Sequence, residues 1–551
     1  MRRDRREEIM AQMEADKRAE KRKRGNGFCR FLSILYTILA AAFVVLLIKL
    51  NALPAKYLYT GIAALVIASI FIVPVMFSKR GKRGRKIGAS VVAVLLIGVF
   101  GVGTWYLTDT LDFIDNITQI KQETEDYYVV VPQEALLENV SGISGQTVGT
   151  YMTNDLRYSE AKAKLQEQVA VEYAYEADFQ TLMQKLLDGS YTAIFVPAAN
   201  YDLSQTTSDT AADPQSSSQT DSAPAQTSET DEAGTQTTGT QTKVLYTVSL
   251  PIETEDQTSA VDVTKESFNV YISGSDMSGS IDVTNRTDVN MVATVNPRTH
   301  EVLLTSIPRD YYVTLPTKNA KDKLTHSSLY GMQESVGAVE TTLGIDINYY
   351  LRVNYSTIIK LVDAMGGIDI NSEHDFYTSG MKGMPELNGH HFTKGVNHVD
   401  GKLALAFCRE RHAFLSGDMQ RNENQQIVLE AILKKALNSK TILTKYTALL
   451  DAVKENMSTN MTPEEMSAII KMQLADMPDW KIERQAIKGT NAYEYCYALG
   501  FKAATVDAIP EEEAKAVDEI VRIATEDIQT ESETKQDAEQ EDGQKEETGD
   551  R

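Results

Sequence analysis

Three long apolar stretches dominate the N-terminal part of the chain, at about 28–50, 57–77 and 87–107. Each has just over 20 residues, the length that a helix rising about 1.5 Å per residue needs to cross about 30 Å of hydrocarbon. A cleavable signal peptide is the alternative for the first stretch, but that stretch is too long for a signal's apolar core and no small-residue cleavage site follows it. The pattern therefore predicts three transmembrane helices over 28–107.

Beyond these stretches, short apolar runs alternate with amphipathic ones, as in small α/β domains. The pattern predicts strands at 127–131, 147–152, 171–175, 191–196 and 244–250, and helices at 158–168 and 179–187. We therefore expect an extracytoplasmic accessory α/β domain over 127–250.

Two segments lack any such pattern. Of the 42 residues in 201–242, 24 are Ser, Thr or Gln, seven are acidic and none is basic. This segment is predicted to be a disordered insertion in the accessory domain. The tail 511–551 has 16 acidic and five basic residues and is predicted to be mostly disordered after a helix near 511–524. The largest module lies between the two, at 266–500.

Charge is divided unevenly among these parts. The net charge of −22 combines +13 in residues 1–107 with −35 in the remaining 444 residues. Basic residues gather in 1–27 and in the loop between the second and third apolar stretches, whereas the loop between the first and second has only Lys56. Because basic loops stay in the cytoplasm, the N-terminus is predicted to be cytoplasmic and everything after about residue 108 extracellular. The basic segment is then a topology determinant, and no nucleic-acid partner is expected.

Charged side chains gather where predicted strands of the largest module begin or end. Asp276 follows a strand at 268–272, Arg286 and Asp288 precede one at 289–295, and Arg309 follows one at 301–307. The last two strands form an antiparallel hairpin, so their charged groups meet at one edge of a sheet, where ligands bind in α/β proteins. Asp276 and Asp288 could share a hard cation such as Mg²⁺, which prefers oxygen ligands.

A second charged region holds five further candidate residues: Arg409, Arg411, Asp418, Arg421 and Gln425. Alternating apolar residues predict a strand over 403–412, which places Arg409 and Arg411 on one face. Asp418 is the predicted N-cap of the next helix, in which Arg421 and Gln425 share a face. Such a cluster binds phosphate or pyrophosphate. A single arginine would be better explained by a surface ion pair, but several at the ends of elements favour the anion site.

Six motifs now become recognisable, in this order: GSD at 274–276, RTD at 286–288, SIPRD at 306–310, DAMGG at 363–367, LALAFCRER at 403–411 and GDMQRNENQQ at 417–426. Together they resemble the LytR–CpsA–Psr family, whose members attach lipid-linked glycopolymers to the bacterial cell wall. The resemblance covers about 266–500. It implies an α/β/α catalytic domain with a mixed central sheet, and some family members carry three membrane spans ahead of it.

The resemblance also implies roles for single residues. Asp276 and Asp288 would hold Mg²⁺ on a pyrophosphate, and six side chains would bind its phosphates: Arg286, Arg309, Arg409, Arg411, Arg421 and Gln425. Lys323 lies near another basic contact of the family, and Asp418 would orient Arg421. The sequence departs from the family at Asn424, where many members have an arginine, so the affinity or the polymer preference is in doubt.

The implied reaction is a phosphotransfer: a polyprenyl-pyrophosphate-linked glycopolymer, of teichoic acid or capsule type, donates its glycosyl phosphate to a peptidoglycan hydroxyl and leaves a lipid phosphate. It requires in-line positioning and charge neutralisation. A lipid-pyrophosphate hydrolase and a non-catalytic envelope receptor or regulator are the alternatives. The lipid would need an apolar cleft, for which five residues are candidates: Val353, Ile358, Ile359, Leu361 and Val362. Each of them alone is better explained as ordinary core.

Histidines and cysteines suggest further chemistry. His390, His391 and His398 invite a zinc interpretation, but no cysteine or carboxylate completes a ligand set at the usual spacing. Cys408 and Cys496 both lie in the part predicted to be extracellular, where a disulfide is permitted. We therefore consider a disulfide between them as a hypothesis, equally weighted with two free thiols.

Overall fold

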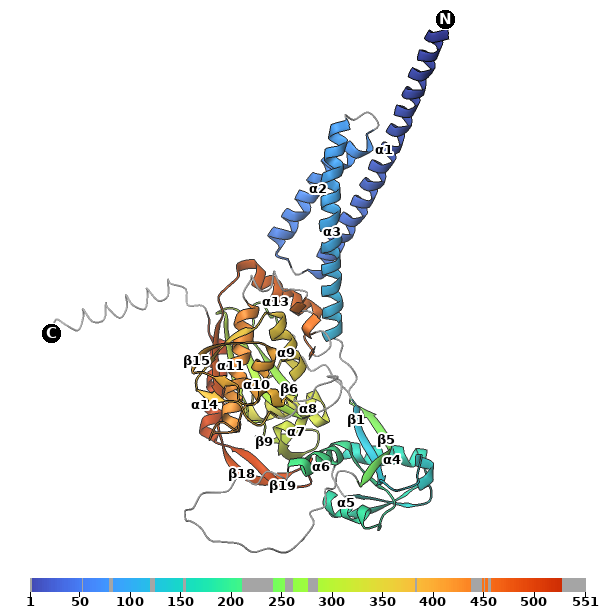
Figure 1. Cartoon of the computed structure of the whole chain (residues 1–551). Helices are drawn as coiled ribbons and strands as arrows, with labels where there is room; N and C mark the ends of the chain where they lie inside the picture. The colour runs from blue at the N-terminus through green and yellow to red at the C-terminus, as the bar shows by residue number, and fades with distance from the viewer. Residues whose placement is uncertain are drawn as a thin grey trace, which may run out of the picture.

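The structure of the protein is a computed structural model, and it describes residues 2–51, 53–78, 83–118, 124–151, 155–210, 241–252, 261–275, 286–381, 384–437, 448–449, 451–453 and 457–527. The N-terminal part forms three long helices (Figure 1): α1 spans Arg2–Leu50, α2 Ala55–Phe77 and α3 Arg83–Thr118. All three are long and apolar enough to cross a membrane, as the apolar stretches predict. However, α3 continues as an unbroken helix 11 residues past position 107.

A five-stranded mixed sheet follows, in the order β3-β2-β4-β1-β5. Its strands are β1 (Thr124–Pro132), β2 (Thr147–Tyr151), β3 (Glu172–Glu176), β4 (Ile194–Pro197) and β5 (Thr242–Pro251), with α4 (Leu156–Gln168) and α5 (Phe179–Leu187) packed on it. All seven predicted elements are present. β5 pairs antiparallel with β1, so the chain returns to this sheet after the Ser- and Thr-rich segment.

The start of the predicted disordered insertion is a helix. α6 spans Ala198–Thr210, and Tyr201 and Leu203 are buried. The prediction is wrong there because these two apolar side chains anchor an otherwise polar segment to neighbouring cores. Residues 211–240 lie outside the described part of the chain.

The larger domain is built on a six-stranded mixed sheet, in the order β16-β11-β6-β7-β8-β17. Its strands are β6 (Phe268–Ser275), β7 (Thr287–Asn296), β8 (Glu301–Ser306), β11 (Tyr349–Asn354), β16 (Met457–Thr459) and β17 (Lys481–Ala486). β6, β7 and β8 are antiparallel neighbours, whereas β11 runs parallel to β6 and β17 parallel to β8; the edge strand β16 is antiparallel to β11.

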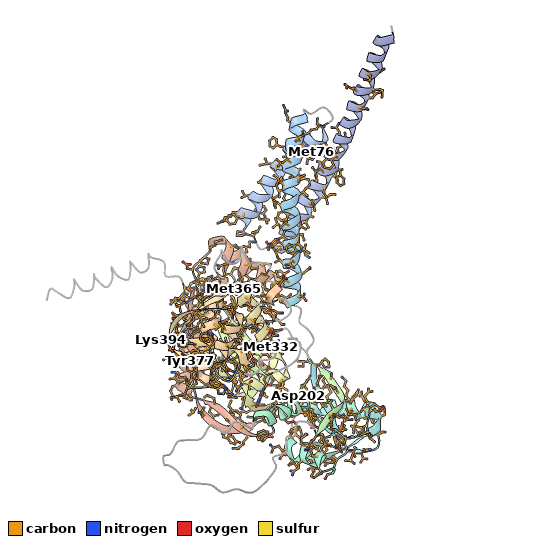
Figure 2. The ribbon with its side chains drawn as sticks, in the orientation of Figure 1. Met76, Asp202, Met332, Met365, Tyr377 and Lys394 are labelled. Carbon is orange, nitrogen blue, oxygen red and sulfur yellow. The ribbon has the colours of Figure 1, made fainter. Side chains whose placement is uncertain are left out.

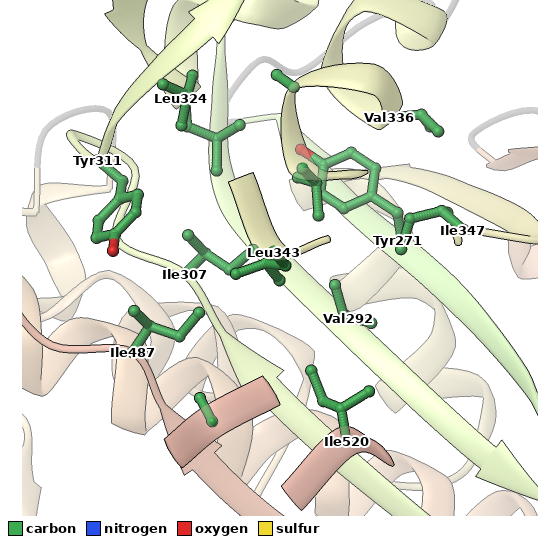
Figure 3. Packing of buried hydrophobic residues seen from close by; sticks show 14 of the residues in the cluster. Tyr271, Val292, Ile307, Tyr311, Leu324, Val336, Leu343, Ile347, Ile487 and Ile520 are labelled. Atoms are coloured by element: carbon green, nitrogen blue, oxygen red, sulfur yellow. The ribbon is translucent and has the colours of Figure 1, made fainter. Parts of the chain in front are cut away.

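Helices cover both faces of this sheet. On one face, α8 (Met332–Leu343) and α14 (Pro510–Thr525) pack on Tyr271 and Val292 (Figure 3). On the other face, α11 (Asp418–Ala436) packs near Met291 and Ala293, with α9 (Tyr355–Ala364) and α10 (Gly401–Arg409) beside it. Val292 alternates with its two neighbours because successive strand residues point to opposite faces. The expected α/β/α fold is confirmed, and α14 is the helix predicted near 511–524.

The remaining elements of the larger domain lie around this sheet: β9 (Tyr312–Leu315), β10 (Ala320–Lys323), β12 (Ile368–Ser372), β13 (Phe376–Tyr377), β14 (His391–Phe392), β15 (Gly395–Val399), β18 (Gly489–Cys496) and β19 (Phe501–Ala508), the helices α7 (Leu324–Ser327) and α13 (Pro463–Asp476), and 3₁₀ turns at Ser328–Tyr330 and Pro385–Leu387. A further 3₁₀ turn, Val140–Ile143, packs in the accessory domain.

A buried charge cluster joins the two domains. Lys318, in the β9–β10 turn of the larger domain, is 1% exposed, and its Nζ lies 2.6 Å from Glu125 Oε1 and 3.2 Å from Asp155 Oδ2 of the accessory domain. Tyr497 donates its hydroxyl hydrogen to the same Asp155 at 3.0 Å. The accessory domain is therefore docked on the larger domain through ions that are excluded from water.

One sequence prediction fails at α10, and of the two alternatives for Cys408 and Cys496 the structure has the free thiols. Residues 403–412 do not form a strand, because Asp400 accepts a hydrogen bond from the Leu403 amide at 2.9 Å and starts a helix. All residues from Ala404 to Cys408 are buried, so the Leu/Ala alternation reflects burial on several sides of a helix. Cys408 and Cys496 are both free thiols, because Cys408 lies in the core beside α10 and Cys496 in a separate cluster at the end of β18.

Candidate functional site

The predicted charged residues of the β7–β8 hairpin meet the first turn of α11. Arg309, which follows β8, places Nη1 2.8 Å from Asp288 Oδ1 at the start of β7. Its Nε lies 3.2 Å from Asp418 Oδ2. The two regions that were predicted separately from the sequence thus form one site.

Asp418 is the centre of this site. Besides Arg309, its carboxylate contacts Arg421 Nη2 at 3.1 Å and Arg411 Nη1 at 3.4 Å. Burial alone would raise the pKa of Asp418, but the three arginines outweigh it and hold that pKa below its ordinary value. The predicted N-cap role is wrong, because Gly417 occupies the cap position and no side chain caps the helix. The carboxylate contacts Arg421 and two more arginines.

Asp288 is also kept ionised. Burial would raise its pKa, but the charges of Arg309 and Arg421, with a smaller effect of Arg286, lower it. A carboxylate with a lowered pKa is a weak base. Asp288 is therefore better suited to hold a cation than to accept a proton.

Lys323 and Asp310 extend the site. Lys323, at the end of β10, places Nζ 3.1 Å from Asp310 Oδ1, and Asp310 Oδ2 lies 3.6 Å from Arg309 Nε. Lys323 therefore joins the arginine cluster through a carboxylate that sequence analysis left without a role, although it stands in the SIPRD motif.

Arg409 is the last residue of α10 and Arg411 lies two residues beyond it, so the two arginines do not share one face of a strand. The Arg409 guanidinium lies 5.4 Å from the centre of the Tyr355 ring, a cation–π distance. Between the two arginines, buried Glu410 accepts hydrogen bonds from the backbone amides of Ser379 at 2.5 Å and His412 at 2.7 Å. Sequence analysis missed this ordering role of Glu410.

Two buried hydrogen-bond donors in α11 have no partner among the described residues: Arg421 Nε and Gln425 Nε2. The Arg421 side chain is 6% exposed. A buried donor without a partner costs free energy, about 1–3 kcal/mol or more when charged. Arg421 and Gln425 stand one helical turn apart on the same face of α11.

Gln425 also lines an apolar cavity of about 360 Å³. Its other walls come from the ends of β6 and β11, from α9 and from the following turns of α11. Of the predicted cleft residues, Val353, Ile358 and Leu361 line the cavity. Ile359 and Val362 do not, because Ile359 packs its backbone on Gly401 and Val362 points into the core beside α10.

The other predicted site residues have different outcomes. Asp276 lies outside the described residues. Arg286 is half-buried at the start of β7. The Asn424 side chain donates a hydrogen bond to the Phe407 carbonyl at 3.1 Å and thereby joins α11 to α10. As a neutral side chain, it supplies no positive charge in place of an arginine. No group of three or more His, Cys, Asp or Glu side chains that could hold a metal occurs within the described ranges.

Three comparisons place the chain among known proteins. A family model, described as the LytR_cpsA_psr family, matches residues 230–515. The polyisoprenyl-teichoic acid–peptidoglycan teichoic acid transferase TagU of Bacillus mycoides is 34% identical over 41% of this chain and 72% of its own length. The protein of the same name from Enterococcus faecalis is 35% identical over 37% of this chain and 65% of its own.

Among solved structures, that of Bacillus subtilis TagU is 29% identical, with a TM-score of 0.37 over 48% of this chain and 100% of that chain. The family match spans 286 of the 551 residues, from 230 to 515. The chain therefore belongs to the LytR–CpsA–Psr family.

Proposed function

We propose that this protein is a membrane-anchored phosphotransferase that attaches polyprenyl-pyrophosphate-linked glycopolymers, of teichoic acid or capsule type, to peptidoglycan. One observation carries the proposal: buried, unpaired donors of Arg421 and Gln425 stand where an arginine cluster meets an apolar cavity. The TagU relatives, whose name states a teichoic acid transfer to peptidoglycan, agree with it.

The charge of the site suits a pyrophosphate. Six cationic side chains (Arg286, Arg309, Lys323, Arg409, Arg411 and Arg421) outnumber the four described carboxylates among them (Asp288, Asp310, Glu410 and Asp418). Because Asp418 already fixes three of the guanidiniums, less side-chain entropy is lost when phosphate oxygens bind. Such fixed donors stabilise the charge that develops during phosphoryl transfer.

The cavity suits the lipid part of the donor. Its polar lining residues include Ser275, Asn354, Thr357 and Gln425, and most of the other lining residues are aliphatic. Burial of apolar surface is worth about 25 cal/mol per Å². A polyprenyl chain bound here would place its pyrophosphate beside Arg421, one turn from Gln425.

Mg²⁺ is proposed as the cofactor. Asp288 fits a hard cation, because its carboxylate is kept ionised. Asp276, the second proposed ligand, lies outside the described residues. When bound, Mg²⁺ would neutralise phosphate oxygens, while the residues of this chain would orient the donor: Arg309, Arg409 and Arg411 on the phosphates, with Lys323 nearby.

The three apolar helices are proposed to anchor the protein in the cell membrane. The basic first part of α1, residues 2–27, and the basic loop before α3 would lie in the cytoplasm, which places both folded domains outside the cell. An extracellular site close to the membrane suits a donor whose tail stays in lipid and an acceptor in the wall.

The experiment uses the full chain in lipid nanodiscs with a polyprenyl-pyrophosphate oligosaccharide, Mg²⁺ and a peptidoglycan acceptor. Wild-type protein is expected to move the oligosaccharide phosphate onto peptidoglycan, and Arg309→Ala is expected to stop the transfer. Release of the sugar phosphate at a rate that does not depend on the acceptor would identify a hydrolase instead. Binding without any turnover would identify a receptor.

A further inference from the structure

The end of α3 has a contact that its membrane role does not require. Past the apolar stretch, Phe113, Ile114 and Ile117 are 7%, 2% and 0% exposed, whereas Asp112 and Asn116 face solvent. The buried residues lie on one side of the helix, as the 3.6-residue repeat requires. This part of α3, residues 107–118, packs on the larger domain (Figure 1).

The residues beneath this part of α3 also line the cavity. Leu361, Val453 and Met457 pack with Phe113, Ile114 and Ile117 on one side and form the cavity wall on the other. A single layer of aliphatic side chains therefore separates α3 from the inside of the cavity.

The contact with α3 lies at the end of the cavity remote from the arginines. Along α11 the cavity extends from Gln425 to Ala436, a rise of about 16 Å at 1.5 Å per residue. At the far end, Gln473 of α13 donates to the Leu437 carbonyl at 3.4 Å, and α13 itself packs on α3 through Met466 and Ile470. The cavity therefore has an arginine end and an α3 end.

The α3 end faces the membrane helices. Lys471 of α13 donates to Asn51 Oδ1 at 3.3 Å, and Lys56 at the start of α2 donates to the Ala475 carbonyl at 3.4 Å. Met365, another lining residue, lies in the part of the domain nearest the three long helices (Figure 2). Both the turn between α1 and α2 and the end of α3 thus meet the domain on this side.

We propose that residues 107–118 of α3 guide the polyisoprenyl tail of the donor from the bilayer into the cavity, past the layer of Leu361, Val453 and Met457. The inference rests on the proposed function, because it assumes a lipid-linked donor. The cavity runs about 16 Å along α11, which is shorter than a long polyisoprenyl chain in extended form, so part of an extended chain would reach from the cavity toward the bilayer. Exposure of that part to water would cost about 25 cal/mol per Å², and a tail lodged between the apolar side of α3 and the layer beneath it would avoid that cost.

Photolabelling of the wild-type full chain in nanodiscs tests the path directly. The probe is a long-tailed polyisoprenyl pyrophosphate with a diazirine in the middle of its tail. Labelled peptides are expected to include residues 107–118 and the segment around 449–457. Labels confined to α11 and the membrane spans, with none on 107–118, would overturn the inference.

Two substitutions test whether the path matters for turnover. Ile114→Asp places a charge on the buried side of α3, and Asn116→Asp places the same charge on its exposed side as a matched control. With the long-tailed donor, Ile114→Asp is expected to lower transfer about ten-fold, the factor that about 1.4 kcal/mol of lost apolar contact gives. A short-tailed, water-soluble donor should be transferred as by wild type.

Each further outcome has one meaning. An equal loss with both donors, or no loss with either, contradicts the guiding role of α3. If wild-type protein transfers neither donor, the proposed function fails instead, and photolabelling still decides whether lipid follows α3.

Discussion

Asp418 is the residue on which the geometry of the site depends most. One carboxylate contacts Arg309, Arg411 and Arg421, which come from three different segments of the chain. Without its charge, the three guanidiniums would repel one another and separate. Because Asp418 acts through these arginines, we describe it as a positioning residue.

Asp418→Asn is expected to lower transfer about ten-fold or more, because charge-assisted hydrogen bonds worth about 1.5–3 kcal/mol would be replaced by neutral ones. The measurement is the rate of glycopolymer transfer by the full chain in nanodiscs. The matched control is Asp369→Asn, an exposed carboxylate paired only with His398 among the described ion pairs. Equal activity of the two variants would show that the arginines keep their places without Asp418.

The lowered pKa values of Asp288 and Asp418 predict acid sensitivity of the fold. As their folded pKa lies below the unfolded value of about 3.9, their contribution to stability is complete above about pH 5 and is lost as the pH falls through the folded pKa. The thermal unfolding midpoint should therefore drop between about pH 5 and pH 3. That drop should be smaller in Asp288→Asn, and an unchanged drop would contradict the role of this carboxylate.

Elements were predictable where one periodicity applied. β7 and β8 are short runs of β-branched and aliphatic residues, which indicate buried strands. Arg421 and Gln425 are four residues apart, which indicates one face of a helix, and both lie in α11. α10 was not predictable, because Leu and Ala alternate in a helix that is buried on several sides. The contact of α11 with the hairpin, and the absence of partners for Arg421 Nε and Gln425 Nε2, arise only in the tertiary structure.

α14 shows that an element in an acidic tail can belong to a core. Ile520 is buried in the cluster with Tyr271 and Val292, whereas neighbouring Val521 is 47% exposed. Ile520→Ala should lower the free energy of unfolding by about 2–5 kcal/mol, the usual cost of a cavity in a core. Val521→Ala should change it by less than about 0.5 kcal/mol. Urea unfolding of the full chain would compare them, and equal effects would mean that α14 is not part of the cooperative core.

At the scale of the whole molecule, Lys318 controls how the two folded domains sit together. Lys318→Ala would leave Glu125 and Asp155 buried with one cation fewer, and removal of one partner from a buried ion pair costs about 3–5 kcal/mol. We expect the accessory domain to separate, seen as faster hydrogen exchange in β1 and α4. Lys321→Ala, in the same hairpin but exposed, is the control. Unchanged exchange in both variants would show that other contacts hold the interface.

The unbroken course of α3 has a consequence for where the protein would work. A flexible tether would let the catalytic edge sample a wide zone of the wall, but a stiff helical post of 11 residues rises only about 16 Å beyond position 107. If the proposed function holds, the standoff between bilayer and domain is set by this post. Peptidoglycan chains would then have to lie within that narrow zone to receive the glycopolymer, which favours the chains nearest the membrane.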